Sequence, residues 1–146
     1  MKNYGKSIRR NFWMKLTENL SRNCLKKDKM YFYDTYALIE MIMGNPNYQR
    51  FWNFKIVCAL NNLFELHQSL LKQFSKKTAD HWMDKFDVLE ASVGDVVRAS
   101  DFRHKNRKEK LSMTDCIGYV IAERNKMRFL TGDEKFKNKK NVEFVK

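Results

Sequence analysis

The chain has 146 residues, 43% of them hydrophobic and 14% aromatic, which is enough for the core of one domain and short for two. It contains no run of about 18 apolar residues, so a membrane-spanning helix is excluded. Its three cysteines lack CxxC spacing, which argues against a zinc site and a disulfide framework and favours the reducing cytoplasm. The net charge of +12 favours a polyanionic partner, with nucleic acid as the first candidate.

The first 29 residues differ from the rest in charge. Nine basic and two acidic residues lie in this segment. Its apolar residues at positions 8, 12, 13, 16 and 20 recur at the spacing of an amphipathic helix. It lacks the apolar stretch of a secretory signal. We therefore expect residues 1–29 to form a basic helical extension and residues 30–146 to form the folded domain.

The first elements of the domain are a strand and a helix. Residues 30–34 form a short apolar run that ends in an acid, and this run predicts a buried strand. A helix is predicted over 35–43, where Gly44 and Pro46 end it. The apolar runs that follow predict a short helix at 47–53, a strand at 55–59, and helices at 60–74, 78–89 and 93–105.

The last third of the chain continues the alternation. Residues 112–125 have helical spacing, 126–131 read as a strand, 133–136 as one helical turn, and 141–145 as a final strand. Strands thus alternate with helices, and no tight hairpin signal joins two strands. This order predicts an α/β domain around a parallel sheet.

Four acidic residues lie near the ends of apolar segments: Asp34, Glu65, Asp115 and Asp133. In an open parallel sheet, functional sites form beyond the carboxyl ends of the strands. Asp34 ends the first predicted strand and Asp133 follows a later one, so both belong to that edge. Carboxylates gathered in one pocket repel one another, and Mg²⁺ or Mn²⁺ relieves the repulsion. The pattern therefore indicates a divalent metal site suited to phosphodiester chemistry.

Helix capping offers another interpretation of the same aspartates. Asp34 suits the N-cap of the helix that follows it. Ser112 and Asp115 have the spacing of a capping box, and Thr131 and Glu134 match that motif outright. The local pattern leaves capping and metal binding open.

Glu65 has the weakest support from periodicity. On a helical wheel it lies nearly opposite the apolar stripe of its helix, and this position predicts a solvated side chain. The stripe consists of residues 60, 63, 64, 70, 71 and 74, with His67.

The densest basic stretch of the domain lies at residues 103–110. Arg103, Lys105, Arg107 and Lys108 are candidate contacts to an RNA backbone. The alternative is a solvated loop.

Taken together, these segments resemble the PIN-domain nuclease family, which includes the VapC-like toxins of toxin–antitoxin pairs. The similarity covers residues 30–146 and is most specific near the C-terminus. The motifs that carry it are MYFYDTYALIE at 30–40, NNLFEL at 61–66, LSMTDCIGYVIA at 111–122, FLTGDEKF at 129–136 and NVEFV at 141–145.

The resemblance implies a three-layer α/β/α sandwich around a central parallel sheet. It also implies a metal-dependent endoribonuclease in which Asp34, Glu65, Asp115 and Asp133 hold Mg²⁺ or Mn²⁺, and the ion activates a water. Thr35, Thr131 and Glu134 would support these carboxylates.

The resemblance further implies the partners. We expect a cytoplasmic toxin that acts on RNA, binds a cognate antitoxin, forms a homodimer and does not associate with membranes. The alternative is a catalytically inactive PIN-like module that binds RNA or protein.

Overall fold

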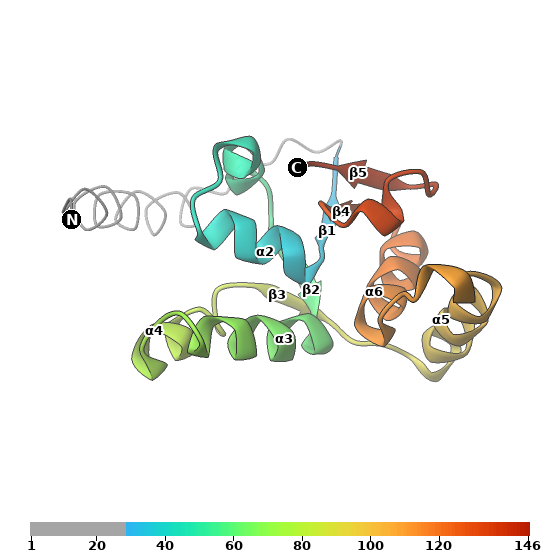
Figure 1. Cartoon of the computed structure of the whole chain (residues 1–146), viewed down its shortest axis with the longest axis horizontal. Helices are drawn as coiled ribbons and strands as arrows, with labels where there is room; N and C mark the ends of the chain where they lie inside the picture. The colour runs from blue at the N-terminus through green and yellow to red at the C-terminus, as the bar shows by residue number, and fades with distance from the viewer. Residues whose placement is uncertain (1–28) are drawn as a thin grey trace.

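The computed structural model describes residues 29–146, which form a five-stranded sheet with helices on both faces (Figure 1). All neighbouring strands are parallel, in the order β3-β2-β1-β4-β5. The strands are β1 (Tyr31–Tyr33), β2 (Val57–Ala59), β3 (Asp87–Leu89), β4 (Arg128–Thr131) and β5 (Val142–Phe144). The predicted parallel α/β fold is therefore confirmed, and the carboxyl ends of all strands lie along one edge.

The helices divide into two layers, as Figure 1 shows. α2, α3 and α4 cover one face of the sheet, and α5 and α6 cover the other. Their bounds are α2 (Thr35–Ile42), α3 (Leu60–Leu71), α4 (Lys76–His81), α5 (Val93–Lys105) and α6 (Met113–Arg124), and three 3-10 helices add η1 (Pro46–Asn53), η2 (Arg107–Glu109) and η3 (Glu134–Phe136).

Alternating side chains on β1 explain the two layers. Tyr31 and Tyr33 pack into the core beneath α2 and α3, while Phe32 packs into the core beneath α6. Successive side chains of a strand point to opposite faces, so a strand buried on both sides reads as one apolar run. The sheet is therefore the middle layer of a three-layer sandwich.

The helix predicted over 78–89 is wrong in its second half. α4 ends at His81, and residues 87–89 form β3, whose Asp87 amide donates to the Ile56 carbonyl at 3.0 Å. β3 is an edge strand, and Val88 remains 37% exposed. It therefore lacks the buried apolar run that identified the inner strands.

The predicted basic extension lies outside the described residues, apart from Lys29, and stays a prediction. Among the helices of residues 29–146, none combines the length and the apolar character needed to cross a membrane.

Candidate metal centre and nucleic-acid surface

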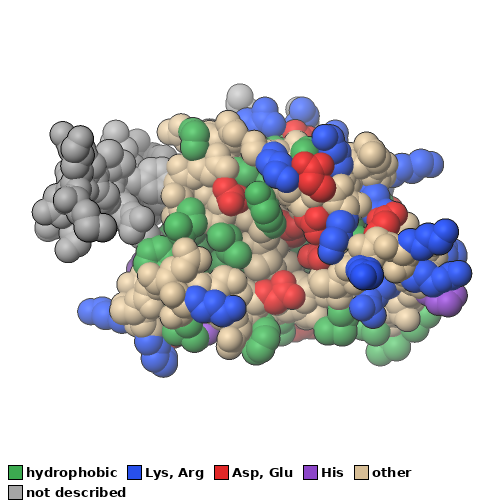
Figure 2. Space-filling model, viewed as in Figure 1, with side chains coloured by type: hydrophobic (Ala, Val, Ile, Leu, Met, Phe, Trp, Pro, Cys, Tyr) green, Lys and Arg blue, Asp and Glu red, His purple; other side chains and the backbone are tan. Residues whose placement is uncertain are grey.

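The four predicted acids line one pocket of about 410 Å³, here called the acidic pocket. Asp34 follows β1 directly and Asp133 follows β4, while Glu65 lies in the second turn of α3 and Asp115 in the first turn of α6. Figure 2 shows acidic side chains gathered near the middle of the face viewed, between the two helical layers. Four separate segments thus bring carboxylates to the edge where the parallel strands end.

Asp34 is the most buried of the four, at 1% exposure. Its Oδ1 accepts from the Ala37 amide at 2.7 Å, as expected for an N-cap, and its Oδ2 accepts from the Thr131 hydroxyl. Burial raises the pKa of Asp34 to about 7 against the effect of these hydrogen bonds, and the nearby charges of Asp115 and Asp133 raise it further. Asp34 therefore caps α2 and lines the acidic pocket at the same time.

A hydrogen-bonded chain orients Glu65. The Thr35 hydroxyl donates to Glu65 Oε2 at 2.9 Å, and Asn62 Nδ2 donates to the Thr35 oxygen at 3.2 Å. Asn62 Oδ1 in turn accepts from the Ala59 amide at 3.1 Å, which ties the chain to the end of β2. Sequence reasoning missed Asn62. Its signal was a polar residue three positions before Glu65, on the same side of the helix.

The predicted apolar stripe of α3 is wrong in part. Leu60 and Phe64 are 63% and 69% exposed, whereas Leu66 and Leu70 are completely buried. The buried face of α3 is therefore rotated from the stripe toward Asn62 and Leu66. This rotation brings Glu65 to the rim of the acidic pocket, where it is partly buried, and leaves part of the stripe exposed.

Asp115 is held by the residue that caps its helix. The Ser112 hydroxyl donates to Asp115 Oδ2 at 2.6 Å and accepts from the Asp115 amide at 3.0 Å. Burial raises the pKa of Asp115, and the charges of Glu65 and Asp133 raise it further. The charges of these carboxylates act on one another because the side chains line the same pocket.

Thr131 does not form the capping box that its spacing predicts. Its hydroxyl donates to Asp34 and accepts from the Asp133 amide at 3.0 Å, so it connects two pocket acids. Asp133 caps η3 instead, by accepting from the Lys135 amide at 3.0 Å. Glu134 is exposed and pairs with Lys146 at 3.0 Å, at the edge of the same pocket.

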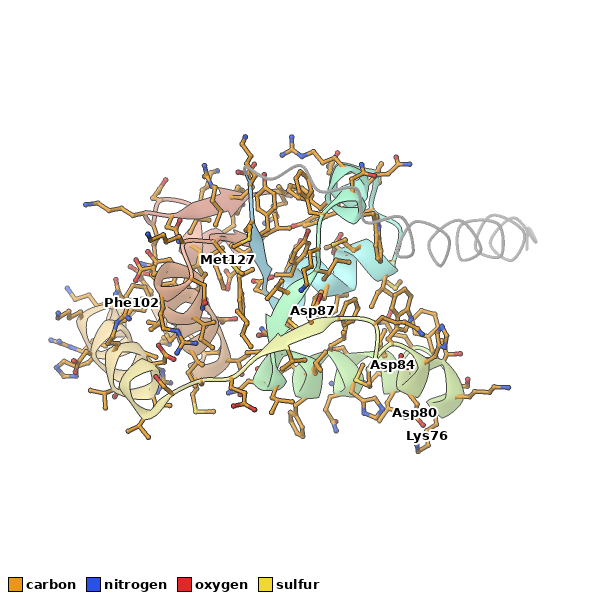
Figure 3. The ribbon with its side chains drawn as sticks, turned by 180° about the vertical axis from the view of Figure 1, so that it is seen from behind. Lys76, Asp80, Asp84, Asp87, Phe102 and Met127 are labelled. Atoms are coloured by element: carbon orange, nitrogen blue, oxygen red, sulfur yellow. The ribbon has the colours of Figure 1, made fainter. Side chains whose placement is uncertain are left out.

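Within residues 29–146, none of the four pocket acids forms an ion pair. Acids elsewhere contrast with them: Figure 3 labels Asp80 and Asp84 at and beside α4, and Asp87 on β3. Each of those three pairs with a lysine, at 2.5, 3.3 and 3.4 Å respectively. The acidic pocket therefore gathers carboxylates that no lysine or arginine of the described residues pairs with directly.

The chemistry of the donors suits a hard divalent cation. The pocket offers carboxylate oxygens, which Mg²⁺ and Mn²⁺ prefer. Burial disfavours the charged form of Asp34 and raises its pKa, and a bound cation would favour the charged form. In the described part of the chain, however, no three carboxylate, imidazole or thiol groups stand close enough together to enclose an ion. The residues fit the ion by type, and side chains would have to draw closer around it.

A second pocket, of about 440 Å³, lies between the end of α5, η2 and the start of α6. We call it the basic pocket. Arg103, His104, Arg107 and Lys110 line it, together with Ser100 and Leu111. Of the predicted RNA contacts, Arg103 and Arg107 are in this set, whereas Lys105 and Lys108 are exposed outside it. All four residues lie in one basic stretch of the sequence, so the sequence alone did not distinguish those that line the pocket from those that do not.

The fold and the acidic pocket define a parallel α/β domain with a carboxylate-rich site at the strand ends. The sequence signature of the PIN domain family matches residues 31–142, most of the chain, and the protein therefore belongs to this family. Members of the family are generally nucleases that use divalent metals. No curated protein matches the chain in a sequence comparison.

Several solved structures share the fold. A toxin–antitoxin complex from Klebsiella pneumoniae is similar with a TM-score of 0.65 and 18% identity, over 79% of this chain and 96% of that one. VapBC2 from Rickettsia felis, bound to a DNA fragment from its promoter, gives 0.62 and 17%, over 80% and 99%. PAE2754 from Pyrobaculum aerophilum gives 0.58 and 16%, over 80% and 89%. At these identities the likeness establishes the fold.

Proposed function

We propose that the protein is a Mg²⁺- or Mn²⁺-dependent endoribonuclease. The observation that carries the proposal is the acidic pocket, which is lined by four carboxylates from four segments, none of them in an ion pair among residues 29–146. Asp34, Glu65, Asp115 and Asp133 would hold the ion or ions. A bound divalent cation supplies a water of lowered pKa and neutralises charge on a phosphodiester.

The chain's own residues act by holding these carboxylates in place. Thr131 fixes Asp34, Thr35 fixes Glu65, and Ser112 fixes Asp115. Because the carboxylates are already held in place, little free energy is needed to reorganise them when the substrate reacts. This preorganisation is how electrostatic groups contribute to catalysis. We assign Glu134 a weaker role, because it is exposed and pairs with Lys137 and Lys146 at the rim.

We further propose that the protein is a toxin controlled by a cognate antitoxin and that it acts in the cytoplasm as a homodimer. Support comes from its similarity in fold to proteins solved as toxin–antitoxin complexes. Exposed apolar side chains on α3 and α5 supply surface for protein contacts: Leu60, Phe64, Leu71, Val93, Val96 and Val97. Burial of such side chains against a partner would stabilise the complex.

A non-catalytic RNA- or protein-binding module is the second candidate. It is favoured by one observation, namely that each pocket acid already accepts a hydrogen bond within the fold. In that case the carboxylates serve only to cap helices and join segments.

Cleavage of RNA by matched variants separates the two functions. We expect the full chain with Mn²⁺ to cut single-stranded RNA, and Asp115→Asn to lose at least about a hundredfold in rate, as is typical when a group that stabilises the transition state is removed. Asp101→Asn, an exposed acid on α5 outside the pocket, serves as the control. Equal rates for the wild type and Asp115→Asn would assign the activity to a contaminant and favour the binding module.

A further inference from the structure

The basic pocket contains basic side chains that do not pair with acids in the described part of the domain. Within residues 29–146, Arg103, Arg107, Lys110 and His104 form no ion pair. Other cations of the domain do pair with acids, including Arg124 with Asp95 at 2.6 Å. Three of the cations that form no ion pair among residues 29–146, Arg103, Arg107 and Lys110, thus line the same hollow.

The local backbone shapes the hollow. Lys110 adopts a left-handed conformation, with φ 52° and ψ 47°, which is uncommon for a residue other than glycine. The turn at Lys110 separates η2 from the start of α6. Arg103 Nε donates to the Leu111 carbonyl at 2.8 Å just after the turn, which orients one face of the guanidinium. Its terminal amino groups make no other hydrogen bond within the described residues.

Lys135 connects the basic pocket with the acidic pocket. Its Nζ donates to the Lys110 carbonyl at 3.2 Å, and its backbone amide donates to Asp133 Oδ1 at 3.0 Å. Leu111 of the basic pocket and Asp115 of the acidic pocket are four residues apart, a stretch of chain that reaches at most about 14 Å. The two pockets are therefore close neighbours on the surface, and Figure 2 shows Lys and Arg side chains gathered toward α5, beside the acidic side chains.

We infer that the basic pocket binds a backbone phosphate of single-stranded RNA, on one side of the phosphodiester held at the acidic pocket. This inference rests on the proposed function and assigns a position to the substrate. A guanidinium matches the paired oxygens of a phosphate, and two arginines with a lysine offer donors from several directions. RNA is a chain of repeated phosphates, so one strand reaches both pockets at once. An acidic protein segment is the competing occupant.

The first test measures RNA binding rather than cleavage, with the full chain, a chelator and a short single-stranded RNA. We expect Arg107→Gln to weaken binding about fivefold to tenfold and to make the dependence of log K on log salt shallower by about 0.7, the value for one phosphate contact on a single strand. Arg107 is exposed, and its side chain makes no hydrogen bond within residues 29–146, so the domain should keep its thermal stability. Lys77→Gln on α4 removes the same charge far from either pocket and should leave binding nearly unchanged.

Lys108→Gln distinguishes a pocket from a diffuse patch. Lys108 is adjacent in sequence and carries the same charge, but it does not line the basic pocket. We expect a clearly smaller effect from Lys108→Gln than from Arg107→Gln. Equal effects of the two substitutions on RNA affinity would overturn the inference. It would also be overturned if Arg107→Gln left RNA affinity unchanged, which is the result expected if an acidic protein occupies the pocket.

RNA strands that carry one neutral methylphosphonate locate the contact. In the wild type, one linkage should be sensitive to the replacement, and in Arg107→Gln that linkage should lose its sensitivity. Equal sensitivity of every linkage in both proteins would overturn the inference. Because these measurements need no cleavage, loss of the pocket effect leaves the nuclease proposal standing. Likewise, absence of cleavage leaves the phosphate contact standing.

Discussion

The hydroxyl of Thr131, at the end of β4, donates a hydrogen bond to the buried carboxylate of Asp34, at the end of β1. The two strands are neighbours in the sheet, and Tyr33 pairs with Leu130 directly before these residues. The register of one strand pair thus places an acid and its hydroxyl partner side by side. The same hydroxyl accepts from the Asp133 amide, so this contact connects two of the acids that line the acidic pocket.

The first prediction concerns the pH dependence of stability without metal. The pKa of Asp34 rises from an ordinary 3.8 to about 7 in the folded protein. Between these values the folded protein binds more protons than the unfolded chain at this residue, so the contribution of Asp34 to stability falls as pH rises. Asp34→Asn removes this effect and keeps a good N-cap. We expect the variant to be more stable than the wild type at pH 8, and the difference to disappear at low pH.

Urea unfolding across the pH range, with a chelator present, measures this difference. Asp101→Asn is the control and should follow the wild type. A stability difference between Asp34→Asn and wild type that stays constant with pH would contradict the raised pKa.

The second prediction concerns Thr131→Val. The change removes a hydrogen bond to Asp34 and one from the Asp133 amide, at a cost of about 1–3 kcal/mol in the free energy of unfolding. Because that hydroxyl lowers the pKa of Asp34, its loss should raise the pKa further and move the pH dependence of stability upward. Thr114→Val on α6 is the control, a buried threonine without a hydrogen bond to the pocket acids in the described structure. An unchanged pH dependence in Thr131→Val would show that the two strand ends are not coupled.

The third prediction concerns Gly132, between Thr131 and Asp133. A Cβ at this position would lie 2.3 Å from the Tyr36 ring and 2.6 Å from the Val145 carbonyl oxygen. Gly132→Ala should therefore destabilise the domain by about 1–3 kcal/mol, the usual range for overpacking. Gly94→Ala is the matched control, because its Cβ would meet only Ser92 Oγ at 3.7 Å, in a helix that favours alanine. Denaturant unfolding of both variants checks the prediction, and equal stabilities would contradict it.

The fourth prediction concerns self-association. Phe64 and Leu60 are largely exposed one turn apart on α3. If this surface forms the homodimer, Phe64→Ser should shift the protein toward the monomer in analytical ultracentrifugation without loss of thermal stability. Met43→Ser, at an exposed methionine after α2, is the control. A dimer that survives Phe64→Ser would place the interface elsewhere, and a monomeric wild type would remove the homodimer from the proposal.

The sheet could be predicted from the sequence because its inner strands are buried on both faces. Apolar runs such as 30–33 and 56–59 have few other interpretations. β3 could not be predicted, since pairing with β2 rather than burial defines it. The burial of α3 could not be read from spacing either. Leu60 and Phe64 have the spacing of core residues but are exposed. Asn62 is polar but is buried, with its side chain in hydrogen bonds.

The candidate site was predictable in its residue types and less so in its connections. Asp34 and Asp133 could be assigned to one edge because parallel strands end together. The link from Asn62 through Thr35 to Glu65 joins residues 27 and 30 positions apart, and no local pattern encodes it. The basic pocket likewise depends on local geometry. Arg107 lines it and the adjacent Lys108 does not, although the two side chains carry the same charge.

The central claim is that the four carboxylates act as one cation site, and Mn²⁺ titration followed by thermal unfolding tests it most directly. A bound ion stabilises the folded wild type by about 2.7 kcal/mol at one hundred times its Kd. We predict that four substitutions each raise the apparent Kd for Mn²⁺ at least about tenfold, which lowers the metal-dependent stabilisation by about 1.4 kcal/mol. They are Asp34→Asn, Glu65→Gln, Asp115→Asn and Asp133→Asn. Asp101→Asn should retain the full gain. The same metal-dependent stabilisation in all five variants and the wild type, or none in any of them at millimolar Mn²⁺, would contradict the account.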